Sequence, residues 1–370
     1  MYDMKTLNWQ KVVTREYSYL WASYTAEAYK IMKKITGTTL KHNLFYTEDK
    51  LLTIYRDPKD IENSFKLIKN LIQKNPRKTL ENMDKFETLT NDGYDLFKEI
   101  NAVQTTEKKK IRNLLLLLDR LFIKIVSYYL FVVFLGYAAD ESVIKKFLSA
   151  NKKQFERIRM GTIDVDMNKE FPKLFAKYDK KLGVHTSYMS RGELINFVKG
   201  KKVDWKKIIT RHKKALLIVK NNVNTECPEK LIAKTLNREL GHSQYNPETK
   251  TIKGTIVQKG LVKGRVVRIM TESEYKNIKK GDILVTPMTK PNILPYLKRV
   301  KGIITNDGGA LSHASIISRE MKIPCIVGTM YATDILINNE KVVLDANQGL
   351  VIRLDKKNPI QAQPLPKTQK

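Results

Sequence analysis

Cysteine is scarce in this chain of 370 residues, which contains only Cys227 and Cys325. Two cysteines so far apart in the sequence exclude a disulfide-stapled scaffold and a cysteine-rich zinc site. The first ten residues, MYDMKTLNWQ, also lack the basic and then apolar pattern of a secretory signal. Together these absences predict a protein of the reducing cytoplasm.

Long uninterrupted hydrophobic runs are absent as well. The most apolar segment, residues 114–139, is interrupted by Asp119, Arg120 and Lys124, and only 15 residues without charge follow from Ile125. A membrane-spanning helix needs about 20 apolar residues, so this segment predicts a buried helix in a bundle. No membrane partner is expected.

Arginine is scarce beside lysine. The two together number 68, of which 15 are arginine, against 38 acidic residues, and the formal net charge is +30. Surfaces that read nucleic acid favour the planar guanidinium group for bidentate contacts with phosphates and bases. The composition therefore argues against a dense surface that reads phosphates or bases, and a lysine-rich proteome or an acidic partner explains the charge about as well as nucleic acid does.

Glycine is scarce only in the first part of the chain, with eight in residues 1–250 and nine in residues 251–354. In the glycine-poor part, apolar residues recur at three- and four-residue steps, which predicts amphipathic helices. These helices are expected at residues 17–35, 61–73, 80–100, 108–135, 141–158 and 204–219, with a hairpin at 43–47 and 50–56. Residues 1–240 are therefore predicted to form a basic, mostly α-helical domain that binds an acceptor or a partner.

Residues 241–250 have the glycine, asparagine and proline content of a linker. The part that follows, residues 251–354, alternates short β-branched runs with glycine turns, which predicts a compact α/β domain. Its strands are expected at 255–259, 264–270, 282–286, 301–305, 325–327, 341–345 and 349–354, with one helix at 313–321. Residues 355–370 are predicted to be a disordered tail. The expected fold class is α+β with more than one domain.

The clearest chemical signal lies in residues 305–329, with the sequence TNDGGALSHASIISREMKIPCIVGT. A β run ends at its first residue, Gly308 and Gly309 form a turn, and Ser312 and His313 open a helix. Adjacent glycines let backbone N–H groups converge on an anion, and the first turn of a helix adds further donors. A neutral imidazole beside such a phosphate site can act as a nucleophile. The same pattern also suits a histidine that merely caps a helix or lies on the surface, and that alternative stays open.

Other catalytic or metal-binding patterns are weaker. The remaining histidines are scattered without ligand spacing, so no metal site is predicted. They are His42, His185, His212 and His242. Ser312 lacks the G-x-S-x-G pattern of a hydrolase nucleophile.

A longer motif can be followed through this region. Its positions are occupied by Thr305, Gly308, Gly309, Ser312, His313, Ala314, Ser315, Ile316, Arg319, Glu320, Pro324, Cys325 and Gly328. Upstream, Thr289, Pro291 and Pro295 stand in a T-x-P-x-x-x-P element. In these features the chain resembles the phosphohistidine swivelling (mobile) domain of phosphoenolpyruvate-utilising enzymes, as in phosphoenolpyruvate synthase, pyruvate phosphate dikinase and rifampin phosphotransferase. The Gly-Gly-x-Leu-Ser-His form looks most like the rifampin phosphotransferase branch.

The resemblance implies a swivelling domain of β/β/α type in which His313 is the catalytic residue. That histidine would take a phosphoryl group at one site and deliver it at another. The residues that the resemblance assigns to phosphate binding are Gly308, Gly309, Ser312, Thr305 and Thr289. It also implies ATP and Mg²⁺, expected on a partner chain with an ATP-grasp fold, and a small-molecule acceptor such as pyruvate.

Two domains of the family are not found in this sequence. Residues 1–250 show no glycine-rich nucleotide loop, and the phosphoenolpyruvate-binding barrel would need about 250 residues after the mobile domain. The expected function is therefore the phosphoryl-carrier component of an ATP-dependent phosphotransferase that works with a separate ATP-grasp subunit. The alternative is a catalytically silent binding module that uses its basic helical half on nucleic acid or another polyanion.

Overall fold

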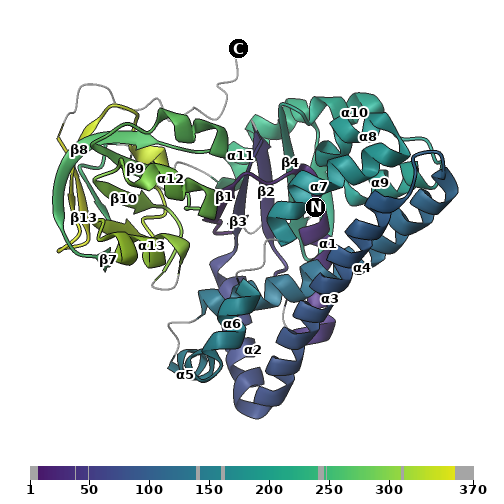
Figure 1. The fold of residues 1–370 in the computed structure, drawn as a ribbon, viewed down its shortest axis with the longest axis horizontal. Helices are drawn as coiled ribbons and strands as arrows, with labels where there is room; N and C mark the ends of the chain where they lie inside the picture. Colours follow the sequence, from purple (N-terminus) through teal and green to yellow (C-terminus); the bar gives the residue numbers. More distant parts are fainter. Residues whose placement is uncertain are drawn as a thin grey trace. The chain divides into compact units, whose positions relative to one another are not determined.

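The computed structural model describes residues 7–354, apart from residues 38, 49, 139–141, 160–162, 241–245, 247 and 310–311. Most of the predicted linker at 241–250 and the whole predicted tail at 355–370 therefore lie outside the described residues. The chain divides into two compact units, and the ribbon is shown in Figure 1. Unit 1 is Met1–Glu16, Thr53–Tyr55 and Leu231–Lys370, and unit 2 is Tyr17–Leu52 and Arg56–Lys230. The predicted boundaries differ from this division, because they assign all of residues 1–240 to one domain.

The helices of unit 2 begin and end where local signals place them. Helix α1 begins after Ser18, whose hydroxyl accepts a hydrogen bond from the N–H of Trp21, and ends before Gly37 at φ +76°. Helix α2 begins at Pro58 directly after its N-cap, Asp57. The helices are α1 (Tyr19–Thr36), α2 (Pro58–Lys74), α3 (Pro76–Ala102), α4 (Lys108–Tyr137), α5 (Ser142–Ala150), α6 (Lys152–Arg159), α7 (Ile163–Tyr178), α8 (Lys180–His185), α9 (Arg191–Val198) and α10 (Trp205–Thr210). Five of the six predicted helical segments are thus confirmed, with the segment at 141–158 formed by two helices, α5 and α6.

Helix α4 contains the most apolar segment of the sequence. Its buried side chains include Leu115, Leu118, Phe122, Ile125, Val126 and Phe131. Asp119 in the same helix is 4% exposed, and it accepts hydrogen bonds from Tyr24 and Arg191. The prediction of a buried helix is confirmed. In the part of the chain that the structure describes, no helix is long and apolar enough to cross a membrane.

The sixth predicted helix, at residues 204–219, is wrong. Helix α10 ends at Thr210, and β4 (Lys214–Lys220) follows, with residues 215–219 all buried. A short apolar run that is buried on both faces has the same hydropathy in a strand as in a helix, so periodicity alone does not separate them. Strand β4 pairs antiparallel with β2 (Asn43–Glu48) and with β5 (Val223–Cys227).

The hairpin predicted at residues 43–56 is confirmed, since β2 neighbours β3 (Leu51–Arg56) in this sheet. The strand order is β1-β3-β2-β4-β5, and β1 spans Gln10–Arg15. The sequence patterns did not indicate β1 or β5.

Unit 1 is built on an eight-stranded sheet with the order β6-β13-β12-β8-β9-β10-β11-β7. Its strands are β6 (Thr251–Lys253), β7 (Thr255–Gln258), β8 (Leu261–Arg268), β9 (Asp282–Thr286), β10 (Gly302–Thr305), β11 (Cys325–Val327), β12 (Lys341–Asp345) and β13 (Leu350–Arg353). Its helices are α11 (Ile232–Leu240), α12 (Leu294–Leu297), α13 (His313–Met321) and α14 (Ala332–Ile335), with short 3₁₀ turns η3 (Glu272–Asn277) and η4 (Pro291–Ile293). Every strand predicted in this part is present, and the predicted helix coincides with α13.

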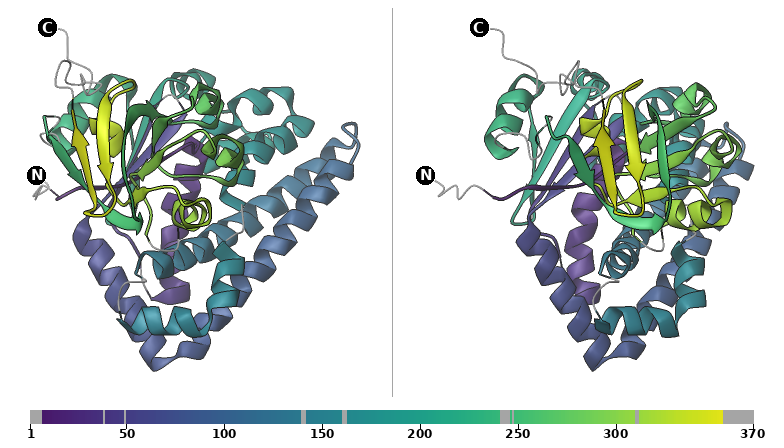
Figure 2. Two further views of the ribbon diagram at one scale, coloured as in Figure 1. Left: turned by 60° about the vertical axis from the view of Figure 1, so that its left-hand side comes forward. Right: turned by 90° about the vertical axis from the view of Figure 1, so that its left-hand side faces the viewer.

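Four neighbouring strands, β8, β9, β10 and β11, run parallel to one another. Their consecutive residues point to opposite faces of the sheet, as the pleat requires. One face packs Val267, Leu284, Ile303 and Cys325 against Ala314 and Ile317 of α13. The other packs Val266, Ile283, Ile304 and Ile326 against Ala332 and Ile335 of α14. Two views of this sheet and its helices are given in Figure 2. Cys325 is fully buried, as its β-branched surroundings indicate.

Candidate functional site

The candidate site lies at the carboxyl ends of three parallel strands. Strand β9 ends at Thr286, β10 at Thr305 and β11 at Val327, and each continues into a loop. In parallel sheets the loops at this edge form the usual position of a ligand or a reacting group. The loop after β10 leads directly into α13, whose first residue is His313.

The loop after β10 is held by hydrogen bonds to the loop beside it. The N–H of Asn306 donates to the carbonyl of Thr286 over 3.2 Å, and the N–H of Asp307 donates to the carbonyl of Pro287 over 2.9 Å. The Thr305 hydroxyl donates to the carbonyl of Asp307 over 2.6 Å. Thr305 thus supports the loop from inside, and its hydroxyl is not available to a phosphate as the resemblance implied.

The two adjacent glycines play different parts in this loop. Gly308 has φ +118°, and a Cβ atom there would lie 2.9 Å from Oγ of Ser312. Gly309 is outside the left-handed region, and among the described atoms a Cβ there would have no neighbour within 4 Å. Both glycines are exposed. The requirement for glycine therefore falls on Gly308, where the backbone is accessible to a small anion.

Helix α13 begins with a serine cap. The Ser312 hydroxyl accepts a hydrogen bond from the N–H of Ser315 and lies 2.9 Å from the Ser315 hydroxyl, which in turn donates to the carbonyl of Gly309. Ser312 is thus occupied in capping the helix. The N–H groups of His313 and Ala314 belong to the first turn, where helical geometry supplies no acceptor, and the helix dipole is positive there. These groups suit a phosphoryl oxygen.

The imidazole of His313 is fixed by a threonine from another loop. Oγ1 of Thr289, which is 2% exposed, lies 2.8 Å from Nδ1 of His313. Partial burial lowers the pKa of His313, and the charge of Glu320 opposes that shift. The ring is therefore neutral near pH 7, and with Nδ1 engaged its free nitrogen is Nε2. Of the residues that the resemblance assigned to the site, the structure brings Thr289 directly to His313.

One residue of the site was missed by sequence reasoning. Asp307 comes directly before Gly308, and its Oδ2 lies 3.9 Å from Nε of Arg15 in strand β1. Burial raises the pKa of Asp307 to about 7, although Arg15 and Lys11 lower it in part. No local pattern could have indicated this pair, because its partners come from opposite ends of the chain.

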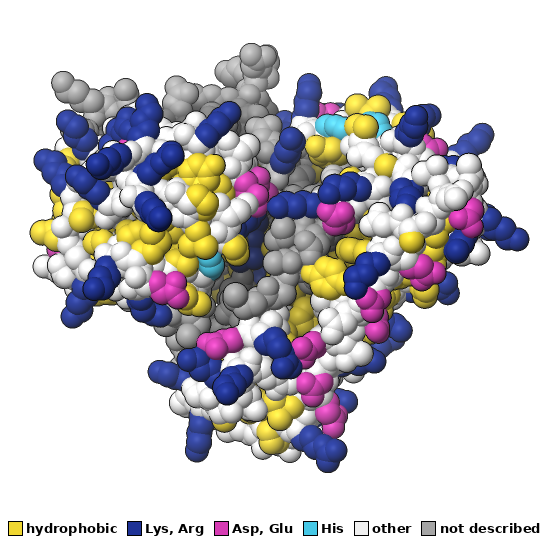
Figure 3. Space-filling view, viewed as in Figure 1, with side chains coloured by type: hydrophobic (Ala, Val, Ile, Leu, Met, Phe, Trp, Pro, Cys, Tyr) yellow, Lys and Arg dark blue, Asp and Glu magenta, His cyan; other side chains and the backbone are white. Residues whose placement is uncertain are grey.

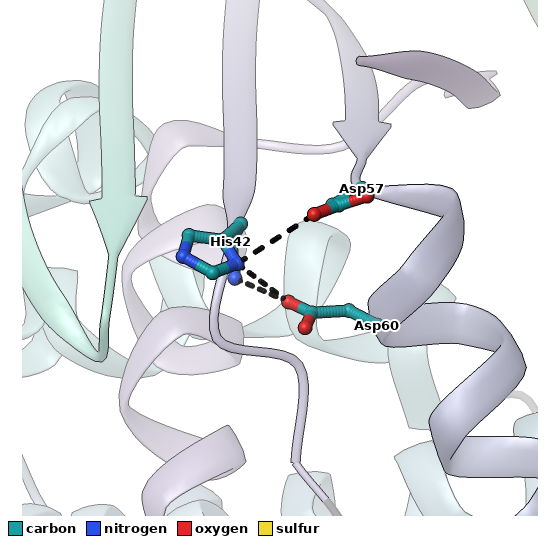
Figure 4. A group of neighbouring side chains, drawn as sticks. All are labelled: His42, Asp57 and Asp60. Carbon is teal, nitrogen blue, oxygen red and sulfur yellow. Dashed lines mark hydrogen bonds and ion pairs between the residues drawn. The ribbon is translucent and has the colours of Figure 1, made fainter. Parts of the chain in front are cut away.

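His42 belongs to a cluster with Asp57 and Asp60 in unit 2, shown in Figure 4. Nδ1 of His42 lies 3.0 Å from Oδ2 of Asp60, and the same oxygen accepts the backbone N–H groups of Lys41 and His42. Asp57 caps helix α2 by accepting the N–H of Lys59 over 3.0 Å. Both carboxylates also lie at the positive end of that helix, which disfavours a cation. The cluster is explained by capping and local hydrogen bonds.

Two further histidines that the sequence leaves scattered meet in space. Nδ1 of His185 lies 3.0 Å from Nε2 of His212, and the ring of Tyr188 stacks on His212 at 3.7 Å between ring centroids. Burial and the neighbouring His185 lower the pKa of His212. The two histidines thus join the end of α8 to the turn that follows α10. The remaining histidine, His242, lies outside the described residues.

Comparison with known proteins relates this part of the chain to a described family. Residues 278–349 match the family described as PEP-utilising enzyme, mobile domain, so the predicted resemblance is confirmed. The chain is 47% identical over 116 residues to a probable phosphoenolpyruvate synthase of Methanothermobacter thermautotrophicus, a stretch that makes up 30% of this chain and 17% of that protein. It is 30% identical over 167 residues to rifampicin phosphotransferase of Bacillus cereus, which is 44% of this chain and 18% of that protein.

These relatives are phosphotransferases, and the chain spans less than a fifth of the length of either one. Among solved structures, a solution structure of Enzyme I (nEIt) is similar over 79% of this chain and 82% of that chain, with 13% identity and a TM-score of 0.22.

Proposed function

We propose that unit 1 is a phosphoryl-carrier domain in which Nε2 of His313 takes up a phosphoryl group and passes it on. The hydrogen bond between Thr289 and Nδ1 of His313, at the start of α13 and beside Gly308, carries this proposal. It leaves a neutral imidazole with one free nitrogen next to a loop and a helix start that favour phosphate oxygens.

The chemistry follows from which nitrogen holds the proton. We propose that Nδ1 holds the proton and donates it to Oγ1 of Thr289, which lies 2.8 Å away, so that the lone pair is at Nε2. That lone pair forms the N–P bond while the P–O bond of the donor breaks, and the electrons of the P–O bond leave with the donor oxygen. The proton on Nδ1 stays in place, and the first-turn N–H groups hold the phosphoryl oxygens. In the second transfer an acceptor oxygen attacks phosphorus, and the N–P electrons return to Nε2.

The phosphoryl donor is proposed to be ATP bound with Mg²⁺ on a separate ATP-grasp subunit. Mg²⁺ prefers carboxylate and phosphate oxygens. Around His313 the described groups are backbone N–H groups and hydroxyls, and the nearby carboxyl of Asp307 faces Arg15 instead. These residues suit the phosphoryl group itself and not its metal. We propose the reducing cytoplasm as its location.

The acceptor is proposed to be a small molecule with a hydroxyl or enol oxygen. The names of the two relatives describe activities of this kind, because one is a probable phosphoenolpyruvate synthase and the other a rifampicin phosphotransferase. The match to the second relative extends over a larger part of this chain, 44% against 30%. We therefore propose that residues before the mobile domain contribute to acceptor binding.

The first test needs no partner. Phosphoramidate is a small phosphoryl donor that modifies reactive histidines, so the full chain is incubated with it and the product is followed by ³¹P NMR and by intact mass. We expect one phosphoryl group, labile in acid and stable in alkali, which is lost in His313→Ala. His242→Ala is the matched control, because it also removes one histidine. Label that persists in His313→Ala overturns the proposal.

The second test asks for the enzymatic donor. The full chain is incubated with γ-labelled ATP and Mg²⁺, alone and with the full-length Methanothermobacter relative, and the two chains are separated before the label is located. We expect label on His313 only in the second mixture. If neither mixture nor phosphoramidate gives label, the alternative of a silent binding module replaces the carrier.

On the face seen in Figure 3, lysine and arginine side chains are spread among acidic ones and form no single stripe.

A further inference from the structure

Strand β1, near the start of the chain, belongs to the same compact unit as the candidate site. Its residues, together with the one that follows it, form ion pairs with the segments that follow β9, β10 and β11. The pairs are Glu16 with Lys290 in the loop after β9, Arg15 with Asp307 in the loop after β10, and Lys11 with Asp334 in helix α14, which follows β11. One short strand thus contacts two of the loops at this edge and the helix that follows the third.

Of the three ion pairs, the one between Glu16 and Lys290 lies next to Thr289, the residue that contacts His313. Oε2 of Glu16 lies 2.9 Å from Nζ of Lys290 and also accepts the backbone N–H of Glu272 over 3.3 Å. Nζ of Lys290 lies 3.1 Å from Oε1 of Glu272, which closes the triangle. Each of the three side chains is between 21% and 27% exposed. The loop after β9 is thereby tied both to β1 and to the start of η3.

These contacts extend to His313 through Thr289. Lys290 directly follows Thr289, whose hydroxyl contacts Nδ1 of the histidine. At the other end of the same loop, the Thr286 hydroxyl donates to the carbonyl of Met288 over 3.0 Å. The position of the Thr289 hydroxyl therefore depends on contacts on both sides of it in the chain. The hydrogen bond from Thr286 to Met288 precedes it, and the ion pair of Lys290 with Glu16 follows it. A small recess lies between β1 and this loop, lined in part by Glu16, Thr286, Met288 and Lys290.

We infer that Glu16 is a positioning residue of the phosphohistidine site and acts through Lys290 and Thr289. It holds the loop after β9 so that Thr289 selects the Nδ1–H tautomer of His313 and directs Nε2 outward. Partly exposed ion pairs contribute little to folding stability. Three such pairs from one strand to two loops and helix α14 are better explained by the geometry that they impose. Of the two measurements described below, only the rate of modification by phosphoramidate depends on the proposed function.

Arg15 and Lys11 also belong to β1, and they give this strand a positive charge. Each phosphoryl transfer brings negative charge beside Gly308, one residue after Asp307. Lys11 and Arg15 of β1 are both positively charged. In a partly buried site their electrostatic attraction for that negative charge extends over several ångströms. Strand β1 therefore places both an anchor and positive charge against the loops that carry the reaction.

The direct test observes the ring of His313 itself. The full chain is labelled with ¹⁵N-histidine, the five histidines are resolved in long-range ¹H–¹⁵N spectra, and His313 is assigned with His313→Ala. In the wild type we expect mainly the Nδ1–H tautomer. In Glu16→Gln and in Lys290→Gln we expect the share of the Nε2–H form to rise at least threefold. Glu248→Gln, which neutralises an exposed glutamate of the same unit, is the matched control and should leave the spectrum unchanged.

The second readout is the rate of modification by phosphoramidate. Glu16→Gln and Lys290→Gln should each lower it about tenfold, and the double variant should be no slower than Lys290→Gln, because that substitution already removes the ion pair in which Glu16 takes part. If the wild type takes no phosphoryl group but the tautomer shift appears, the proposed function fails and the positioning role stands. If Glu16→Gln gives the tautomer ratio of Glu248→Gln, the positioning role is overturned.

Discussion

The hydroxyl oxygen of Thr289 lies 2.8 Å from Nδ1 of His313, although the two residues are 24 positions apart in the chain. Thr289 comes from the loop after β9, and His313 opens the helix after β10. Because β9 and β10 are parallel neighbours, their carboxyl ends bring the two loops together. The orientation of the histidine is thus set by sheet topology and does not depend on its own helix alone.

Replacing Thr289 by valine tests this contact with almost no change in volume. Valine removes the hydroxyl, so Nδ1 loses its partner and the ring loses its preference for one tautomer. We expect Thr289→Val to lower the rate of His313 phosphorylation about tenfold, measured with labelled phosphoryl donor. Thr289→Ser keeps the hydroxyl and should retain most of the rate. Equal rates in the valine and serine variants would show that the hydrogen bond has no part in the reaction.

The two glycines of the loop should respond differently to alanine. Gly308 has φ +118°, and its Cβ would lie 2.9 Å from Oγ of Ser312, so Gly308→Ala should cost about 1–3 kcal/mol of stability. Gly309→Ala meets no described neighbour within 4 Å and should change stability by less than about 0.5 kcal/mol. Urea denaturation of the two variants checks this. The reverse order of the two costs would contradict the backbone geometry of the loop.

Local signals in the sequence predict much of this site. The bounds of α13 follow from a glycine turn and a serine cap before an apolar stripe, and the strands of unit 1 follow from β-branched runs between glycines. His313 could be singled out from the sequence because the residues that surround it are adjacent to it in the chain. In each case the information lies within a few residues of the feature.

Features that depend on distant residues could not be predicted in this way. Strand β4 looks like a helix in isolation, and only its pairing with β2 makes it a strand. Gly308 and Gly309 are indistinguishable until the turn is built. The ion pair of Arg15 with Asp307 joins opposite ends of the chain, and no pattern in either segment indicates it.

Unit 2 contains a buried charge whose loss should be costly. Asp119 accepts a hydrogen bond from the Tyr24 hydroxyl over 2.8 Å and two from Arg191, over 2.7 and 2.8 Å. Removing the carboxylate leaves the buried Tyr24 hydroxyl without this acceptor and leaves Arg191 paired with Glu27 instead, so Asp119→Ala should cost about 1–3 kcal/mol. Asp119→Asn keeps two polar atoms and should cost less. The denaturation midpoint of unit 2, followed through its tryptophans, measures this difference, and similar midpoints for alanine and wild type would refute it.

The pH dependence of stability should carry a contribution from Asp307. Burial raises its pKa from 3.8 to about 7, with Asp334 adding to the shift and Arg15 and Lys11 opposing it. Because the folded pKa lies above the unfolded one, folding favours the protonated carboxyl. Its stabilising contribution is complete below about pH 3.8 and is lost as the pH rises through about 7.

Asp307→Asn removes this titration and keeps the shape of the side chain. We expect the variant to gain stability relative to the wild type on going from pH 5 to pH 8, as measured by denaturant unfolding at several pH values. Arg15→Gln is the complementary variant. It takes away the cation nearest to the carboxyl, so the pH at which the wild-type side chain loses its proton should move upward. A stability difference between Asp307→Asn and wild type that stays constant from pH 5 to pH 8 would show that Asp307 does not titrate differently in the folded and unfolded protein over this range, and it would contradict the raised pKa of this carboxyl.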